Sequence, residues 1–119
     1  MPILSNHYVL AVHSIAKASE FYTRALGFEE VFNDGNWSFL KRDNCMVMLG
    51  ECRDAVPARD LGDHSYFAYL VVDDADSFFS RCKAEKAEIT SPIEDKPWQM
   101  REFGIRTPDG HRIMIGHDL

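Results

Sequence analysis

The chain has 119 residues, 45% of them hydrophobic, and a formal net charge of −6. This length and composition fit one globular domain with a core of its own. The acidic balance argues against nucleic acid as a partner, because phosphate binding needs clustered Lys and Arg; a small cationic molecule is a more natural partner.

The three cysteines, Cys45, Cys52 and Cys82, follow no CxxC spacing. An odd, unpatterned set favours reduced thiols and a cytoplasmic location over a disulfide framework or a zinc site. The N-terminus MPILSNHYVL lacks a basic stretch followed by an apolar run. The chain also lacks an apolar segment of about 18 residues, the length that a membrane span needs. We therefore expect neither secretion nor a membrane span.

The first half of the chain predicts a strand followed by a helix. His7–Val12 is a short β-prone run, and Ser14 follows it in the position of a helix N-cap. Ile15–Leu26 carries apolar residues at helical spacing, and Gly27 stands where a C-terminal cap belongs. Three β-like segments with turn signals between them come next: residues 27–34, 36–43 and 44–51.

The same order returns in the second half at nearly the same lengths. Tyr66–Val72 is again β-prone, and Asp73 or Asp74 can cap a helix over residues 75–87. One face of that helix is apolar and carries Ala75, Phe78, Phe79 and Cys82. The β-like segments that follow are residues 87–95, 101–107 and 110–116, with a turn at Pro108-Asp109-Gly110.

Each half therefore reads strand, helix, strand, strand, strand. We predict an α+β fold of one domain, residues 1–119, in which two βαβββ modules form a curved mixed sheet around a concave cavity. Module one covers residues 1–50, a charged connector covers 51–64, and module two covers 65–119.

The layout and the phrases FYTRALGF and TPDGHRIMI together resemble the vicinal oxygen chelate superfamily. This superfamily includes glyoxalases, extradiol dioxygenases and bleomycin resistance proteins. The resemblance covers essentially the whole chain. It does not say which member this is, so function has to be argued from the residues of the cavity.

Enzymes of this superfamily hold a divalent metal with His and Glu from the first and last strands of each module. The resemblance places these positions on His7, Met48, Phe67 and Met114. Only His7 is a competent ligand, because thioether and phenyl groups do not replace imidazole and carboxylate donors. We therefore expect no metal and no other cofactor. The remaining histidines fall in turns or at strand ends and are not expected to be ligands: His13, His64, His111 and His117.

Within the superfamily, PWQMREFGIRTPDG and LGFEEVFNDGNWSFLKRDN resemble bleomycin resistance proteins most closely. Those proteins are acidic, metal-free homodimers that sequester a cationic drug in grooves between subunits, where aromatic rings stack on its flat tail. The aromatic positions of that groove fall on Phe32, Trp37, Tyr69 and Trp98. The resemblance thus implies four stacking residues and a homodimer.

The same residues point to binding without the family. Trp37 and Trp98 are expected at equivalent places in the two halves, and large rings stack on planar or cationic ligands. Met48 would make an apolar cavity adaptable in shape. Polar contacts are expected from Arg101, Glu102 and Arg112. Two alternative roles for Glu102, which stands beside Arg101, are acid–base chemistry and a cross-strand ion pair at a sheet edge, and the ion pair is favoured over acid–base chemistry.

We predict a metal-independent protein that sequesters an aromatic or cationic antibiotic-like small molecule, with no catalytic residue. The alternative is a lyase, isomerase or dioxygenase of the same superfamily with a rearranged metal site. A further alternative is an interaction module whose aromatic surface is only the dimer contact. For Cys45 and Cys52 the sequence nominates no general base.

Overall fold

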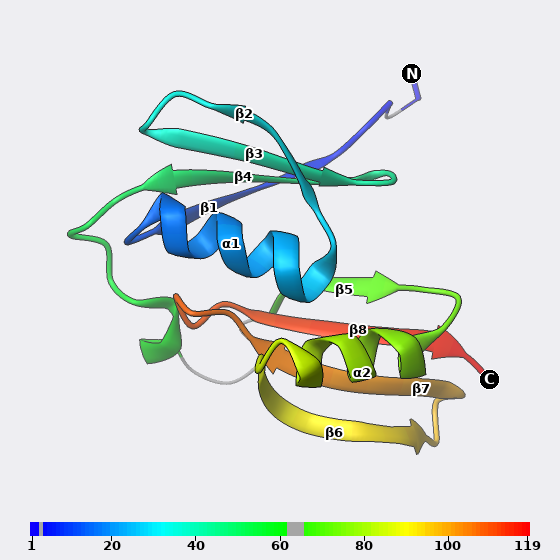
Figure 1. Cartoon of the computed structure of the whole chain (residues 1–119). Coiled ribbons are helices and arrows are strands. Elements are labelled where there is room, and N and C mark those ends of the chain that lie inside the picture. Colours follow the sequence, from blue (N-terminus) through cyan, green and yellow to red (C-terminus); the bar gives the residue numbers. More distant parts are fainter. Residues whose placement is uncertain (3, 62–65) are drawn as a thin grey trace. The chain divides into compact units, whose positions relative to one another are not determined.

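The computed structural model describes residues 1–2, 4–61 and 66–119 of the chain (Figure 1). The chain divides into two compact units, Met1–Val56 and Pro57–Leu119. The last residues of the predicted connector, 62–64, and residue 65 lie outside the described part. A short 3-10 helix, η1 (Ala58–Asp60), lies in the described part of the connector.

Unit one contains a four-stranded mixed sheet, here called sheet one, with the strand order β1-β4-β3-β2. Strand β1 pairs parallel with β4, and the two other pairings are antiparallel. Helix α1 lies along one face of this sheet (Figure 1). The elements are β1 (His7–Val12), α1 (Ile15–Leu26), β2 (Glu29–Asn33), β3 (Trp37–Arg42) and β4 (Cys45–Glu51).

The ends of α1 are set by the two residues that the sequence nominates. The side chain of Ser14 accepts a hydrogen bond from the backbone N–H of Lys17. Gly27 adopts φ 73°, a left-handed conformation that is easily reached by glycine because it has no Cβ. Its backbone N–H donates a hydrogen bond to Thr23 O. Both predicted caps are confirmed.

The core of unit one lies between α1 and the face of sheet one that α1 covers. Side chains alternate between the two faces of a strand, so every second residue of β3 and β4 points toward α1. Leu40, Val47 and Leu49 do so and are buried. They face a stripe on α1 made of Ile15, Ala18, Tyr22, Ala25 and Leu26.

Unit two repeats this arrangement in sheet two, whose strand order is β5-β8-β7-β6. Here β5 and β8 are parallel, and the other neighbours are antiparallel. The elements are β5 (Tyr66–Val71), α2 (Ala75–Ala84), β6 (Glu88–Lys96), β7 (Met100–Arg106) and β8 (Arg112–Asp118).

Helix α2 begins at an Asp cap and ends earlier than predicted. The carboxylate of Asp74 accepts from the backbone N–H and the hydroxyl of Ser77, so Asp74 rather than Asp73 is the N-cap. The helix ends at Ala84, not at residue 87, because Lys86 adopts φ 61° and redirects the chain into β6. Phe79 of α2 packs edge-on against Phe103 of β7, with ring centroids 5.1 Å apart.

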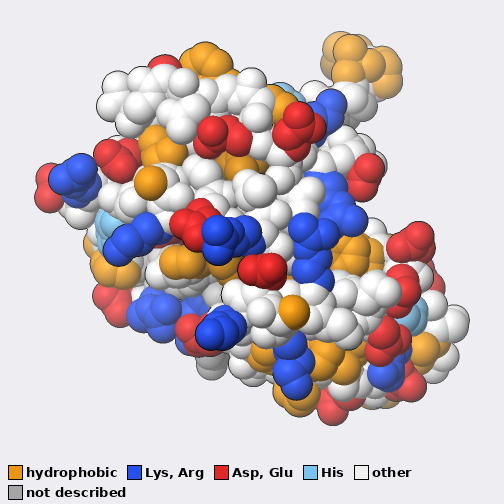
Figure 2. Space-filling view, viewed as in Figure 1, with side chains coloured by type: hydrophobic (Ala, Val, Ile, Leu, Met, Phe, Trp, Pro, Cys, Tyr) orange, Lys and Arg blue, Asp and Glu red, His pale blue; other side chains and the backbone are white. Residues whose placement is uncertain are grey.

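The α+β class and the two βαβββ modules are as the sequence predicts. Neither α1 nor α2, the two α-helices of the described ranges, has the length and apolar character needed to cross a bilayer. Over α2 and β6, Figure 2 shows side chains of both charges with hydrophobic side chains between them.

Candidate functional site

A tight hairpin between β6 and β7 carries Trp98. The backbone N–H of Gln99 donates to Lys96 O at 3.0 Å, which closes the turn, and Gln99 adopts φ 64°. Pro97 suits the start of such a turn because its φ is fixed. The three-residue loop therefore holds the Trp98 side chain just ahead of β7, where 61% of its surface is exposed.

Trp98, Tyr69 and Glu102 meet through hydrogen bonds to one oxygen. The indole Nε1–H of Trp98 donates to Glu102 Oε1 at 2.7 Å, and the hydroxyl of Tyr69 donates to the same oxygen at 3.0 Å. Glu102 is only 5% exposed. Three predicted binding residues, Tyr69, Trp98 and Glu102, thus form one cluster, here called the Glu102 cluster. Helix α2 and strand β6 separate Tyr69 from the other two in the sequence.

The Glu102 cluster lies on the face of sheet two turned away from α2. Its neighbours in sequence, Arg101 and Phe103, both contact α2, and alternation directs Glu102 to the opposite face. Gly116 of β8 pairs with Glu102 in the register. A Cβ at Gly116 would stand 2.6 Å from the Tyr69 hydroxyl oxygen, so the Tyr69–Glu102 bond occupies space that this glycine leaves free.

No described Lys, Arg or His forms an ion pair with Glu102. Its cross-strand partner is Glu94, so the alternative of a cross-strand ion pair is wrong. Lys96 instead pairs with Glu94 and places its ammonium 5.9 Å from the centre of the Trp98 ring. Burial, and then the bond and charge of Glu102, raise the pKa of Tyr69 to about 12, so Tyr69 remains a donor at neutral pH.

Of the two other predicted polar contacts, Arg101 lies on the opposite face of sheet two from this cluster, whereas Arg112 lies on the same face at the other end of β8. Arg101 points to the helix side of sheet two, where it donates to Asp76 of α2 and to Asp95 of β6. This bond to Arg101 lowers the pKa of Asp76. Arg112 opens β8, on the same face as Met114 and Gly116, and pairs with Tyr66 and Arg106 in the register.

A second aromatic group lies on the helix-free face of sheet one. The rings of Phe32 and Phe39 are 4.9 Å apart, and those of Trp37 and Phe39 are 6.3 Å apart in an edge-on arrangement. The indole of Trp37 covers Gly50, where an added Cβ would meet it at 3.0 Å. Phe32 and Trp37 are 45% and 38% exposed, so a ring surface remains available.

The turn before β3 fixes the position of Trp37. One carboxylate oxygen of Asp34 accepts from the backbone N–H groups of Asn36 and Trp37, at 2.9 and 2.8 Å. These two donors lower the pKa of Asp34. The Asn33-Asp34-Gly35 signal in the sequence is therefore the physical anchor of this tryptophan.

The two tryptophans are not equivalent in the strand register. Trp37 pairs with Gly50 of β4, whereas the residue that pairs with the corresponding Gly116 of β8 is Glu102. Trp98 precedes β7 altogether. Both tryptophans lie near the start of the third strand of their module, as expected, but the β6–β7 loop sets Trp98 back from β7, so their places differ in register.

The positions that hold the metal in enzymes of the family do not carry a set of nitrogen and oxygen ligands in this chain. Met48 lies between Val9 and Phe39 in sheet one, Met114 lies between Tyr69 and Gly104 in sheet two, and Phe67 packs edge-on against His111. Within residues 1–2, 4–61 and 66–119, no three His, Cys, Asp or Glu side chains gather closely enough to hold a metal ion. The residues present therefore do not fit the divalent metal of the enzymes.

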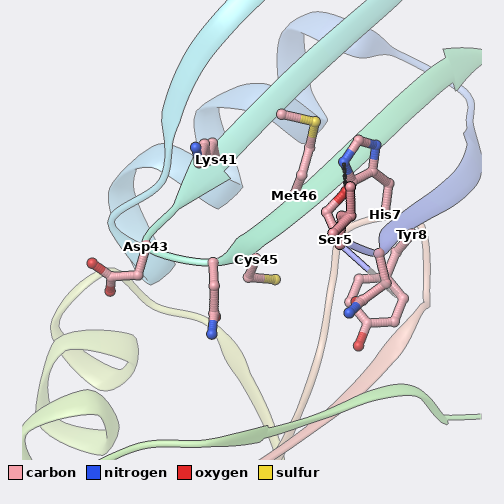
Figure 3. Close-up of a pocket in the computed structure, with 10 residues that line it drawn as sticks. Ser5, His7, Tyr8, Lys41, Asp43, Cys45 and Met46 are labelled. Carbon is pink, nitrogen blue, oxygen red and sulfur yellow. Dashed lines mark hydrogen bonds between the residues drawn. The ribbon is translucent and has the colours of Figure 1, made fainter. Parts of the chain in front are cut away.

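His7 lies instead in a polar pocket of unit one with a volume of about 530 Å³ (Figure 3). Ser5 and His7 lie beside each other on the β1 side, with Ser5 Oγ 3.5 Å from His7 Nε2, and Lys41 comes from the β3–β4 hairpin. Cys45 also lines the pocket, and burial raises the pKa of its thiol, which disfavours the nucleophilic thiolate. None of the predicted stacking residues lines this pocket.

Two of the other histidines make structural hydrogen bonds. His117 Nδ1 accepts from the backbone N–H of Ala75 at the start of α2, and His13 Nε2 lies 3.0 Å from Ala55 O. His64 lies outside the described residues.

Sequence reasoning missed residues that shape both aromatic groups. Phe39 links Phe32 to Trp37, and its place two residues after Trp37 in a strand could have shown that they share a face. The roles of Gly50 and Gly116 depend on cross-strand register, which no local pattern gives.

Comparison with known proteins agrees with this architecture. The family model of the Glyoxalase/Bleomycin resistance protein/Dioxygenase superfamily matches residues 4–115. No curated protein sequence matches the chain.

Three solved structures illustrate the similarity of fold. TioX from Micromonospora sp. ML1 is 24% identical over 97% of this chain and 100% of its own, with a TM-score of 0.78. A bleomycin resistance determinant encoded on the transposon Tn5 is 24% identical over 96% and 97%, with a TM-score of 0.78. A bleomycin-binding protein complexed with bleomycin is 22% identical over 97% and 98%, with a TM-score of 0.78.

Proposed function

Because this chain belongs to the glyoxalase/bleomycin resistance protein/dioxygenase superfamily, we propose that it binds and sequesters a small molecule without transforming it. The ligand carries a flat aromatic part or a cationic part, and is antibiotic-like. Support comes from two similar folds, a bleomycin resistance determinant and a bleomycin-binding protein, together with the side chains of this chain.

The observation that carries the proposal is the Glu102 cluster. Trp98 is largely exposed, yet its indole is held in one orientation by the bond to Glu102, and Tyr69 is held by the same oxygen. A ring that is oriented in advance loses little conformational entropy when a flat group stacks on it. Such stacking contributes about 0.5–2 kcal/mol per ring.

A second ligand-binding surface is proposed at the aromatic group of sheet one. Phe32 and Trp37 present exposed ring area there, and Met48 lies beside Phe39 in the register. Met48 is flexible and polarizable, so it can adapt to ligands of different shape. On sheet two, Arg112 is the proposed polar contact besides Glu102.

The proposed binding is independent of metal. Lewis-acid chemistry of the glyoxalase or dioxygenase kind needs oxygen or nitrogen donors around the ion, and the family positions carry Met48, Phe67 and Met114 beside the single His7. We also propose a homodimer in the cytoplasm, as the resemblance and the three unpatterned cysteines suggest.

Calorimetric titration with metal-free bleomycin tests the proposal. We expect saturable binding by the wild-type protein, and a loss of affinity of about two- to thirtyfold in Trp98→Ala, from the stacking energy of one ring. Phe78→Ala on α2 is a control outside both surfaces. Equal affinity of wild type and Trp98→Ala would remove the stacking role, and binding that requires an added divalent metal would favour the enzyme alternative.

A further inference from the structure

Glu102 is buried, and its negative charge has no cationic partner among the described residues. It is 5% exposed, and both hydrogen bonds that it accepts go to Oε1, from two neutral donors. Within the described residues, Oε2 accepts no hydrogen bond and no cationic side chain forms an ion pair with Glu102. A buried carboxylate without a cation is costly, so a cationic group that reaches Oε2 would be bound favourably.

The surroundings of Glu102 increase the preference for a positive charge. Glu94 is its cross-strand neighbour, and the charge of Asp118 acts on the adjacent Tyr69. Among the residues that the structure describes, Lys96 places its ammonium over the Trp98 ring, and this ammonium pairs with Glu94. Lys96 therefore marks where a cation is favourable without neutralising Glu102.

We propose that Glu102 Oε2 binds a cationic N–H donor of the ligand, a protonated amine, amidinium or guanidinium group, while Trp98 packs against the adjoining flat part. The inference rests on the proposed function and identifies the chemical group that this site selects. Trp98 and Tyr69 act as donors that fix Oε1 and leave Oε2 for the ligand. A charge-assisted hydrogen bond is stronger than one between neutral groups.

Three probes of nearly the same size separate the contributions to binding. Benzamidinium has a flat ring, a charge and N–H donors; benzamide has the ring and the donors without the charge; phenyltrimethylammonium has the ring and the charge without donors. We expect benzamidinium to bind at least about tenfold more tightly than either of the others. The readout is the shift of the Trp98 indole N–H resonance, assigned with Trp98→Phe, since the chain has two tryptophans.

A matched pair of variants tests the carboxylate itself. Glu102→Gln keeps an acceptor oxygen for Trp98 and Tyr69 but removes the charge, and is expected to weaken benzamidinium binding at least about tenfold and leave benzamide unchanged. Glu85→Gln removes one negative charge at the end of α2 instead, and is expected to change neither the benzamidinium affinity nor the benzamide affinity. Thermal unfolding checks that both variants are folded, and the wild-type comparison of probes needs no variant.

The outcomes separate this inference from the proposed function. If bleomycin binds in a Trp98-dependent way but benzamidinium and benzamide bind equally, the cation site is wrong and sequestration stands. If phenyltrimethylammonium binds as well as benzamidinium, the ring of Trp98 and not Glu102 selects the charge, and the inference also fails. If benzamidinium binding depends on Glu102 while bleomycin does not bind, the cation site stands and the bleomycin-like ligand is wrong.

Discussion

The indole N–H of Trp98 lies 2.7 Å from Oε1 of Glu102, four residues further along the chain. The bond joins a hairpin loop to a buried strand position, so an exposed ring is held by a group that cannot move freely. A side chain that would otherwise sample several rotamers is thereby fixed for contact with a ligand.

Replacing Glu102 by Leu removes the acceptor of both Trp98 and Tyr69. We expect the Trp98 indole to become mobile on the picosecond to nanosecond timescale, because the hydrogen bond that orients it is lost. Heteronuclear relaxation of the indole N–H measures this mobility. Glu102→Gln, which keeps an acceptor, should leave the ring ordered; an indole equally rigid in both variants would contradict the positioning role.

The ionisation of Tyr69 should be separable from that of the other tyrosines. Its pKa is raised to about 12 from an ordinary value of 10, by burial first and then by Glu102. A raised folded-state pKa contributes stability that is complete below pH 10 and is lost as the pH rises from 10 through 12. Tyr69→Phe should show a smaller fall in unfolding free energy over this range than wild type, and identical falls would contradict the shift.

Gly116 should be intolerant of a side chain because Tyr69 and Glu102 fill the space beside it. An added Cβ would stand 2.6 Å from the Tyr69 hydroxyl oxygen and 2.9 Å from Glu102 Cβ. We expect Gly116→Ala to cost about 1–3 kcal/mol of stability, as overpacking does. In a Tyr69→Phe background Gly116→Ala should cost less stability, since the hydroxyl oxygen nearest to the added Cβ is gone. If the stability losses of Gly116→Ala and Tyr69→Phe simply add in the double variant, this packing is contradicted.

Arg101 tests whether strand alternation has been assigned correctly. Its guanidinium bridges Asp76 of α2 and Asp95 of β6, on the helix side of sheet two. Arg101→Ala should lower the melting temperature by a few degrees at most, since these pairs are partly exposed, and should leave benzamidinium and bleomycin affinity within about twofold of wild type. A large loss of affinity would place Arg101 in the binding site instead.

The sequence predicted the fold well because its signals are local. The pattern of Ile15–Leu26 with Ser14 and Gly27 fixes a helix and both of its ends, and the Asn33-Asp34-Gly35 turn fixes the start of the next strand. The end of α2 was missed because Lys86 takes a left-handed conformation that its residue type does not signal.

The site was predicted less completely because it depends on register between distant strands. Trp98, Tyr69 and Glu102 were each nominated, but nothing local indicates that they share one oxygen atom. Arg101 and Glu102 are adjacent in sequence and were grouped together, yet consecutive residues of a strand face opposite sides. Only the pairing of β7 with its neighbours separates a structural arginine from the glutamate of the cluster.

The most direct test of ligand binding at the Glu102 cluster follows the two indole N–H resonances while metal-free bleomycin is added to the ¹⁵N-labelled protein. We predict that the Trp98 resonance shifts and saturates with the ligand, and that this response is much weaker in Glu102→Gln. Tight binding with an unmoved Trp98 resonance would contradict it.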